Sequence, residues 1–383
     1  MKIIKYVILI FLGIASVSTT TLAQASALNE IISAYETHEA SLLKANKVSW
    51  PQNDPASLLS ENQIYTDLHK RLSSISVESL DKQSQIDYEL LDLILEDKIY
   101  LHNYGSHLFP LTAEGGFIIG MLYSARGATI KNEKEGQQYL SKLKDLKRYI
   151  DQQISWMREG LDQTKVMPKL VVNNCLQVLR NAVSDDAAFL LKPIVETQLS
   201  DATKKEAAAL RTTELIPWLK KLETFLKDEY LPKTYEQVGI SNNTDGHSFY
   251  EQRVRYYTTL DMTPQEIYDV GLSEVARIRK EMDAIITELK YDGDFASFIT
   301  FLREDPQFYA KTPQELLSHA AWLSMKAQEI LPKYSTVLPR LPFTVTPVPD
   351  EIAPTYTTGR YSGGSMSSGR SGQYWVNTYN LPA

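Results

Sequence analysis

The sequence lacks the residues that cross-link many exported proteins. It has one cysteine among 383 residues, Cys175, so an internal disulfide is excluded and the fold must depend on a packed core. A catalytic thiol needs a histidine beside it, and the nearest histidines in the sequence are His107 and His247. We therefore predict that Cys175 is a small buried side chain rather than a nucleophile.

The six histidines lack the spacing of a zinc site. His38 and Glu39 begin like the zinc-peptidase motif H-E-x-x-H, but Leu42 stands where the second histidine must lie to share the helix face. The sequence therefore predicts no metal ligand in this chain. The other histidines, which are isolated or at the wrong spacing, are His69, His102, His107, His247 and His319.

Nucleophile and phosphate-binding motifs are absent as well. In "GGSMS", Ser365 has Gly363 two residues before it but Ser367 two residues after it, so the pattern G-x-S-x-G is not met. The segment "SGRSG" has no phosphate-loop lysine. The net charge of −7 argues against a nucleic-acid partner, which calls for a basic face. The residue chemistry alone therefore predicts no catalytic residue.

Long apolar runs are missing after the first residues. The run "VILIFLGIASV" follows Lys2 and Lys5 and is shorter than the roughly 20 residues of a membrane-spanning helix. Ala23 and Ala25 then form a small-x-small site, so residues 1–25 are predicted to be a signal peptide, cut after Ala25 or after Ala23. No cysteine follows the run, which argues against a lipid anchor. We expect an exported protein, periplasmic or secreted, with no stable membrane anchor after cleavage.

Most of the sequence has the pattern of amphipathic helices. In "YLSKLKDLKRYIDQQISWMREGL", apolar residues recur every three or four positions, which predicts a helix with one apolar stripe over 134–161. The residues of this stripe are Leu140, Leu143, Leu146, Ile150, Ile154, Met157 and Leu161. Further helices are predicted over 28–45, 58–73, 77–101, 168–182 and 203–229.

Two more helices carry start signals. Thr263 is a good N-cap, Pro264 suits the first helical position and Glu266 can complete a capping box. The same letters, "TPQE", recur at 312–315 before another apolar-periodic segment. The side chains expected on the buried face of the first helix are Ile267, Val270, Val275, Ile278, Met282, Ile285 and Leu289.

Glycine and proline interrupt the helical pattern. Residues 110–130 are expected to form a bent connection that can include a strand. Six prolines between Leu331 and Pro354 rule out a continuous helix there. The segment "GRYSGGSMSSGRSGQYWVNTYNLPA" that follows is typical of a loop leading into a strand. The sequence therefore predicts a mainly α fold, with an elongated multi-helix body over 26–345 and a loop-and-strand region over 346–383.

Several segments together suggest a family. They are "REGLDQTKVMPKLVV", "YYTTLDMTPQEIYDVGLSEVARIRKEM", "FLREDPQFYAKTPQELL" and "GRSGQYWVNTYNL". In this order they resemble the bacterial family catalogued as domain of unknown function 885, and the resemblance runs through most of the chain after the signal peptide. It implies an exported or cytosolic metallopeptidase of the zincin group with a largely helical, elongated body.

The resemblance also implies where a peptide substrate would bind. In the family, the segment R-P-G-x-aromatic-aromatic-V-N leads into a helix with His-Glu and then Pro-Gly-His-His. Ser371 replaces the proline here, and the zinc helix does not occur before Ala383. Zinc is therefore expected only in a full-length family member, and no cofactor in this chain. The strand is expected to pair with an extended peptide. The residues expected to contact the substrate are Arg370, Gly372, Tyr374, Trp375 and Asn377.

Three hypotheses about function remain open. The chain is the N-terminal part of an exported zinc-metallopeptidase-like protein, truncated before its zinc helix and inactive alone. Alternatively, it is a metal-free helical protein that binds a peptide or a partner, or an intact enzyme with unrecognised catalytic residues. Under the first hypothesis, Trp322, Trp375 and Val376 would be partly exposed, so the C-terminal region is expected to promote self-association.

Overall fold

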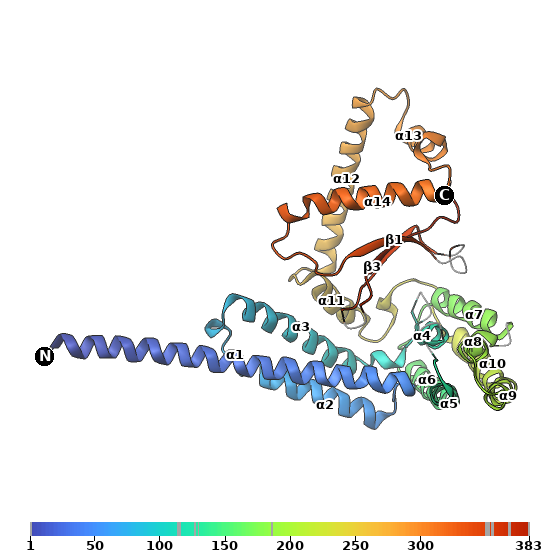
Figure 1. Cartoon of the computed structure of the whole chain (residues 1–383), viewed down its shortest axis with the longest axis horizontal. Helices are drawn as coiled ribbons and strands as arrows, with labels where there is room; N and C mark the ends of the chain where they lie inside the picture. Colours follow the sequence, from blue (N-terminus) through green and yellow to red (C-terminus); the bar gives the residue numbers. More distant parts are fainter. Residues whose placement is uncertain are drawn as a thin grey trace. The chain divides into compact units, whose positions relative to one another are not determined.

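Helices account for most of the fold, and the strands lie together near its C-terminal end (Figure 1). The structure is a computed structural model that describes residues 2–112, 116–125, 128, 130–184, 187–348, 353, 356–366 and 369–381, with side chains from residue 23 onward except that of residue 123. Its contacts define two compact units, Met1–Ile267 and Tyr268–Ala383. The predicted mainly α class with a C-terminal strand region is confirmed. The units divide at 267/268, whereas the sequence placed a boundary at 345/346.

The first unit consists of helices joined by short connections. The helical segment from residue 201 to residue 230 contains two π-helical turns, Arg211–Leu215 and Phe225–Tyr230, on either side of α10 (Ile216–Thr224). Among the residues that the structure describes, no helix is long and apolar enough to cross a membrane. The helices are α1 (Lys2–Val48), α2 (Pro55–Leu72), α3 (Lys82–Tyr104), α4 (Phe117–Ser124), α5 (Glu133–Lys144), α6 (Leu146–Asp162), α7 (Lys169–Ser184), α8 (Ala188–Val195), α9 (Asp201–Leu210), α10 (Ile216–Thr224) and α11 (Gly246–Thr258).

The predicted apolar stripe over 134–161 is confirmed, on two consecutive helices rather than one. Its members from Leu140 to Met157 are between 0% and 2% exposed. Asp145 separates α5 from α6, and its carboxylate accepts hydrogen bonds from the Trp50 backbone N–H (3.0 Å) and from Arg148 (2.7 Å). Burial alone would raise the pKa of Asp145, but the hydrogen bonds and charge of Arg148 outweigh it and lower that pKa.

Two apolar cores hold the first unit together. The larger core contains side chains from every helix of the series α4 through α10, with the α5–α6 stripe among them. It includes Cys175, which is fully buried. The prediction that Cys175 is a small buried side chain is confirmed, and burial raises the pKa of its thiol to about 11. The smaller core joins α1, α2 and α3. Its buried members are Leu28, Ile31, Tyr65, Leu68, Leu72, Ile75, Leu80, Leu91 and Leu95.

A buried ion pair ties α11 to α3. Arg253 of α11 meets Asp97 of α3, and their side chains are only 14% and 11% exposed. The Arg253 guanidinium also lies over the rings of Phe249 and Tyr256, at 5.6 and 4.9 Å from their centroids. Removing one partner of such a pair leaves the other charge buried without compensation, so α11 is anchored by electrostatics as well as by packing.

The connection over 110–130 contains one short helix, and its other described residues form turns and loops. Helix α4 occupies Phe117–Ser124, and Phe117, Ile118 and Met121 point into the larger core. Its apolar residues make it a short buried helix, a pattern that periodicity alone cannot separate from a buried strand. The expectation of a strand here was therefore wrong for the described residues of this segment.

The second unit combines helices with a three-stranded sheet. Its elements are α12 (Pro264–Glu288), α13 (Phe295–Glu304), α14 (Pro313–Ile330), β1 (Phe343–Pro347), β2 (Gly359–Ser362) and β3 (Gly372–Val376). The strand order is β1-β3-β2, with β1 parallel and β2 antiparallel to β3. The predicted capping box of α12 is present, since Thr263 N–H donates to Glu266 (2.8 Å) and Glu266 N–H donates to Thr263 Oγ1 (3.2 Å).

The apolar face of α12 is exposed, so the predicted burial of that face was wrong. Val275 is 67% and Leu289 is 61% exposed, and Val270, Ile278, Met282 and Ile285 are also exposed. The described residues of the second unit therefore leave most of this stripe uncovered. The buried apolar residues described in the second unit are Ile286, Val348, Ala353 and Val376.

This contrast predicts different costs for truncating the two stripes. Leu143→Ala should lower the free energy of unfolding by about 2–5 kcal/mol, because it leaves a cavity in a fully buried site. Val275→Ala should change it by less than about 0.5 kcal/mol, because that side chain is already exposed. Urea unfolding followed by circular dichroism measures both. Equal costs would mean that the α12 face is buried in solution.

Candidate functional site

The five residues predicted to contact a peptide lie in or beside β3. This strand is the centre of the sheet, with Gly372–Val376 paired to β1 on one side and to β2 on the other. The prediction that this strand pairs with an extended peptide was therefore wrong, because both of its edges are already used. Only β1 and β2 leave an edge that no other described strand occupies.

Backbone and side-chain contacts fix the start of β3. Gly372 N–H donates to Pro342 O (3.0 Å), and a Cβ on Gly372 would lie 2.2 Å from the Tyr361 hydroxyl. Arg370 is exposed and donates through Nη2 to Gly363 O (2.9 Å), while its backbone pairs with Ser365. The loop before β3 is thus folded back on itself, with the Arg370 guanidinium at its surface.

The two aromatic residues of β3 point to opposite faces of the sheet, as alternate residues of a strand do. Tyr374 is 37% exposed. Trp375 is half-buried, donates from Nε1 to Gln373 Oε1 (3.0 Å) and lies 6.0 Å from the Tyr356 ring. Partial exposure, predicted for Trp322 and Trp375, is confirmed, but Val376 is buried at 5% exposure.

Asn377 is a structural residue in this geometry. Its Nδ2 donates to Ala353 O (2.8 Å) and to Tyr356 O (3.2 Å), and its Oδ1 accepts from Tyr379 N–H (3.0 Å). Its backbone N–H donates to Thr358 O (2.8 Å). Because one amide side chain joins the end of β3 to the segment before β2, substrate contact by Asn377 stays a prediction that this geometry does not require.

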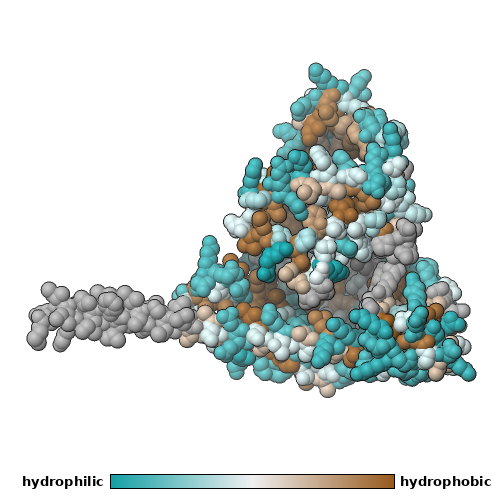
Figure 2. All heavy atoms as spheres, in the orientation of Figure 1, coloured by the Kyte–Doolittle hydropathy of each residue, from teal (hydrophilic) through white to brown (hydrophobic). Residues whose placement is uncertain are grey.

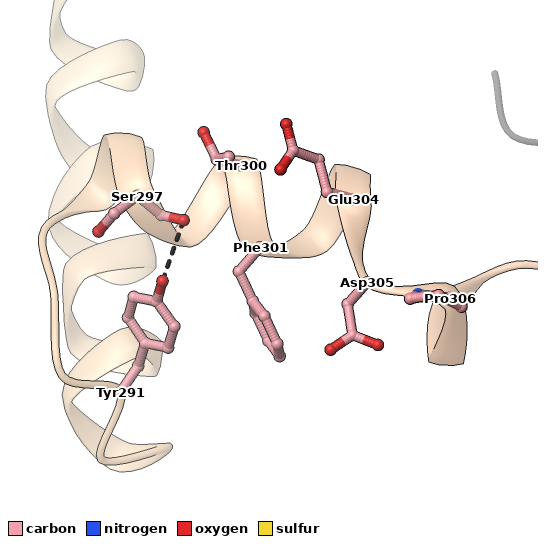
Figure 3. Close-up of a pocket in the computed structure, with 7 residues that line it drawn as sticks. All are labelled: Tyr291, Ser297, Thr300, Phe301, Glu304, Asp305 and Pro306. Carbon is pink, nitrogen blue, oxygen red and sulfur yellow. Dashed lines mark hydrogen bonds between the residues drawn. The ribbon is translucent and has the colours of Figure 1, made fainter.

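A shallow hollow of about 530 Å³ lies beside α13 (Figure 3). Tyr291 donates its hydroxyl proton to Ser297 O (3.0 Å), and Phe301 packs near it at 5.4 Å between ring centroids. Glu304 and Asp305 supply carboxylates at its edge, but none of its lining residues is a histidine, cysteine or lysine. The hollow therefore lacks the histidine, cysteine or lysine that commonly activates a nucleophile.

The histidines do not assemble a peptidase site in the described residues. His102 and His107 face each other at 6.0 Å between ring centroids, but His107 also packs edge-on against Trp156 at 4.5 Å. Burial, together with the charges of His102 and Lys165, lowers the pKa of His107 to about 4. His38 packs against Tyr65 and His319 stacks on Trp322. These three histidine rings therefore pack against aromatic side chains.

His69 is isolated in the sequence but not in space. Its Nε2 lies 3.1 Å from Asp92 Oδ1, and Glu96 is nearby. The sequence analysis missed this group because its members come from two helices. The signal that could have found it is the pair Asp92 and Glu96, four residues apart on one face of a predicted helix.

Comparison with known proteins gives a family and a fold. Residues 39–383 match the family described as "Bacterial protein of unknown function (DUF885)". No curated protein sequence matches the chain.

Two solved structures share the fold. One is a "putative lipoprotein" from Colwellia psychrerythraea, with a TM-score of 0.75 and 17% identity over 95% of this chain and 68% of the other. The second is a "putative lipoprotein of unknown function" from Shewanella oneidensis, with a TM-score of 0.61 and 16% identity over 95% and 65%. The chain thus spans about two thirds of the length of these proteins, and at this identity the likeness is one of fold.

Asn377→Ala should loosen the segment that precedes β2. It removes two hydrogen bonds to Ala353 and Tyr356, each contributing about 1 kcal/mol. Limited proteolysis should then cut faster between residues 353 and 358. Arg370→Ala, which removes one exposed hydrogen bond, is the matched control and should leave the cutting rate unchanged. Equal acceleration by both variants would contradict a structural role for Asn377.

The lowered pKa of His107 predicts a loss of stability in acid. In the unfolded chain a histidine has a pKa of about 6.5, so between about pH 6.5 and 4 the unfolded state takes up a proton that the folded state refuses. Stability is therefore fully present above pH 6.5 and falls towards pH 4, by about 1–2 kcal/mol after allowance for solvent screening.

The measurement is urea unfolding at several pH values. His107→Gln should flatten the decline below pH 6.5, whereas His247→Gln, at an exposed position, should leave it intact. An unchanged slope in the His107 variant would show that this imidazole is not the group responsible.

Proposed function

Because the chain belongs to the DUF885 family of bacterial proteins of unknown function, we propose that it is the helical, non-catalytic portion of an exported metallopeptidase-like protein and is inactive alone. The zincin resemblance supplies the reaction class. Such an enzyme needs at least three protein ligands for zinc and a general base. The chain has no H-E-x-x-H sequence, because Leu42 stands four residues after His38, where the motif needs its second histidine. Zinc and its ligands would come from additional polypeptide.

The exposed apolar face of the second unit is the observation that carries this proposal. Besides the α12 stripe, Trp322 is 56% and Met325 is 64% exposed on α14. Figure 2 shows brown apolar side chains at the surface in the upper region that Figure 1 assigns to α12–α14. Large exposed apolar patches are typical of surfaces that contact another polypeptide, a membrane or a ligand, and we propose the first of these here. Burying several hundred Å² there would contribute roughly 5–10 kcal/mol, comparable to the stability of a domain.

The proposed role of the sheet is to border the substrate cleft. A peptide would add at the free edge of β1 or β2, because β3 is paired on both sides. Arg370 and Tyr374 are exposed near these strands and would contact the peptide through side chains. Gly372, Trp375 and Asn377 would shape the loop and the sheet face behind it.

Export is the second element of the proposal. The two solved structures compared above are each described as a "putative lipoprotein", and the first 25 residues have the pattern of a signal peptide. Helix α1 continues through that segment, but its described buried positions begin at Leu28. A cut after Ala25 would keep Leu28 and Ile31 in the smaller core, at the cost of one hydrogen bond from Ser76 N–H to Gln24.

The same apolar face also suits a metal-free protein that holds a peptide or a partner. In that case the α12 stripe itself is the binding surface, and no catalytic polypeptide is required. The two proposals differ in what restores activity. Only the first expects hydrolysis when the chain is combined with the polypeptide that follows the corresponding region in a full-length relative.

The first test is catalytic. The purified chain, dialysed against metal-free buffer, should retain no zinc by elemental analysis and should hydrolyse no member of a peptide library, because the ligands of a zincin site are missing. Hydrolysis should remain absent when zinc is added to the assay. Hydrolysis that a chelator abolishes, or one zinc retained per chain through dialysis, would overturn the proposal.

The second test addresses the exposed face. The chain should self-associate in ultracentrifugation and bind a hydrophobic dye, and Val275→Lys should weaken both because it places a charge in the α12 stripe. Leu59→Lys, at a 62% exposed position of α2, is the control and should change neither. A monomeric wild type without dye binding would mean that the α12 and α14 surfaces need no covering partner.

A further inference from the structure

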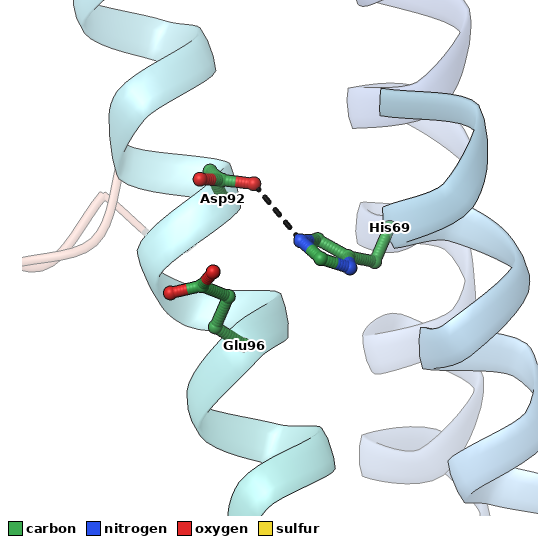
Figure 4. Close-up of side chains that lie close together, drawn as sticks. All are labelled: His69, Asp92 and Glu96. Atoms are coloured by element: carbon green, nitrogen blue, oxygen red, sulfur yellow. Dashed lines mark hydrogen bonds and ion pairs between the residues drawn. The ribbon is translucent and has the colours of Figure 1, made fainter. Parts of the chain in front are cut away.

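Three potential metal ligands meet on the surface of the α2–α3 helix pair. His69 projects from α2, and Asp92 and Glu96 project from α3, one helical turn apart. One ligand atom of each lies within 4.8 Å of the other two. Figure 4 shows the His69 ring directed at the Asp92 carboxylate, with the Glu96 carboxylate beside it. The group thus offers one nitrogen and two oxygen donors within 4.8 Å of one another.

The backbone positions of these three residues are fixed by the smaller core. Each follows directly after a buried leucine: His69 after Leu68, Asp92 after Leu91, and Glu96 after Leu95. The leucines are at most 5% exposed and belong to the same apolar cluster. A binding site built on packed helices is held more rigidly than one on loops, so little order is lost when an ion binds.

No lysine or arginine of the described residues neutralises the two carboxylates of the group. Among the described residues, neither Asp92 nor Glu96 forms an ion pair with a lysine or arginine, and the ion-pair partner of Asp92 is His69. Other carboxylates of the first unit are paired with basic side chains, such as Glu39 with Lys98 and Glu206 with Lys144. Two carboxylates on consecutive turns repel each other, and a divalent cation between them would remove that repulsion.

We propose that His69, Asp92 and Glu96 form a binding site for an exchangeable divalent transition-metal ion, with Zn²⁺ as the best-fitting representative. Imidazole together with carboxylate selects zinc, cobalt, nickel or manganese over calcium and magnesium, which prefer oxygen ligands alone. Zinc with three protein ligands takes water as the fourth, and the half-exposed position of His69 leaves room for it.

The local adjustment needed is small. Donor atoms about 2.1 Å from a tetrahedral zinc lie about 3.4 Å apart, so the group must contract by roughly an ångström. Glu96 is exposed and can supply this by rotating its side chain. His69 would bind through Nε2 in its neutral form, with the proton on Nδ1, replacing its present contact with Asp92. The bound ion would cross-link α2 to α3.

This site is distinct from the zinc of the proposed peptidase, whose ligands lie outside this chain. Three ligands at the protein surface predict micromolar, exchangeable binding, which dialysis removes. No hydrolysis is expected with the ion bound. Metal binding at His69 and the catalytic tests above can therefore succeed or fail independently.

The experiment is calorimetric titration of the full chain with Zn²⁺, with Mg²⁺ as the comparison ion. We expect one zinc per chain, no magnesium binding, and a rise in the melting temperature of about 2–3 °C at saturating zinc. His69→Gln and Glu96→Gln should each weaken binding at least tenfold. With Co²⁺, the wild type should show the visible absorption of a nitrogen–oxygen site, and His69→Gln should lose it.

Two control variants keep the outcome interpretable. Glu89→Gln removes an exposed carboxylate from the same helix, and His247→Gln removes an exposed histidine of α11, so both should bind zinc like the wild type. Circular dichroism of every variant checks that α2 and α3 stay folded. The proposal is overturned if the wild type binds no zinc, or if folded His69 and Glu96 variants bind it as tightly as the controls.

Discussion

Burial of the α5–α6 stripe is the constraint on which the first unit depends. Its leucines and isoleucines fill the centre of the larger core, and α4, α7, α8, α9 and α10 pack around them. The stripe passes across the junction at Asp145 without a break. That is possible because Arg148 and the Trp50 backbone hold the Asp145 carboxylate at the protein surface while the apolar residues on either side stay inside. One ion pair thus lets two helices act as a single apolar surface.

The second unit shows what happens when an equally regular stripe has no counterpart. Helix α12 has a complete capping box and an apolar residue every three or four positions, yet most of those residues are exposed. Local hydrogen bonds and helix propensity suffice to define the helix itself. They do not supply the tertiary burial that stabilises most protein helices. The sheet, held by backbone pairing to β3, and the aromatic cluster of Tyr291, Phe298 and Phe301 provide much of the remaining order.

The α5–α6 stripe and the α12 stripe show which features of the fold the sequence can predict and which it cannot. Periodicity predicted the helices over 134–161 and 263–289 and their apolar faces, because spacing is a local property. Periodicity correctly predicted that Leu143 is buried but wrongly predicted that Val275 is buried. Burial depends on which other elements pack against a helix face, and the local sequence does not contain that information. The group of His69, Asp92 and Glu96 escaped for the same reason: its ligands are brought together by two helices. The central place of β3 depends on pairing with β1, about thirty residues earlier, which no local pattern contains.

The sheet order β1-β3-β2 has a consequence for how the protein folds as it is made. In the part of the chain that the structure describes, β1 and β2 do not pair with each other, and each pairs with β3, the last of the three along the chain. During synthesis, β1 and β2 therefore emerge before the strand that joins them exists. Until Gly372–Val376 arrives, both segments present unpaired backbone groups, which chaperones or an export machinery can hold in extended form. The sheet order thus makes β3 the strand whose synthesis completes the hydrogen-bonding of both others.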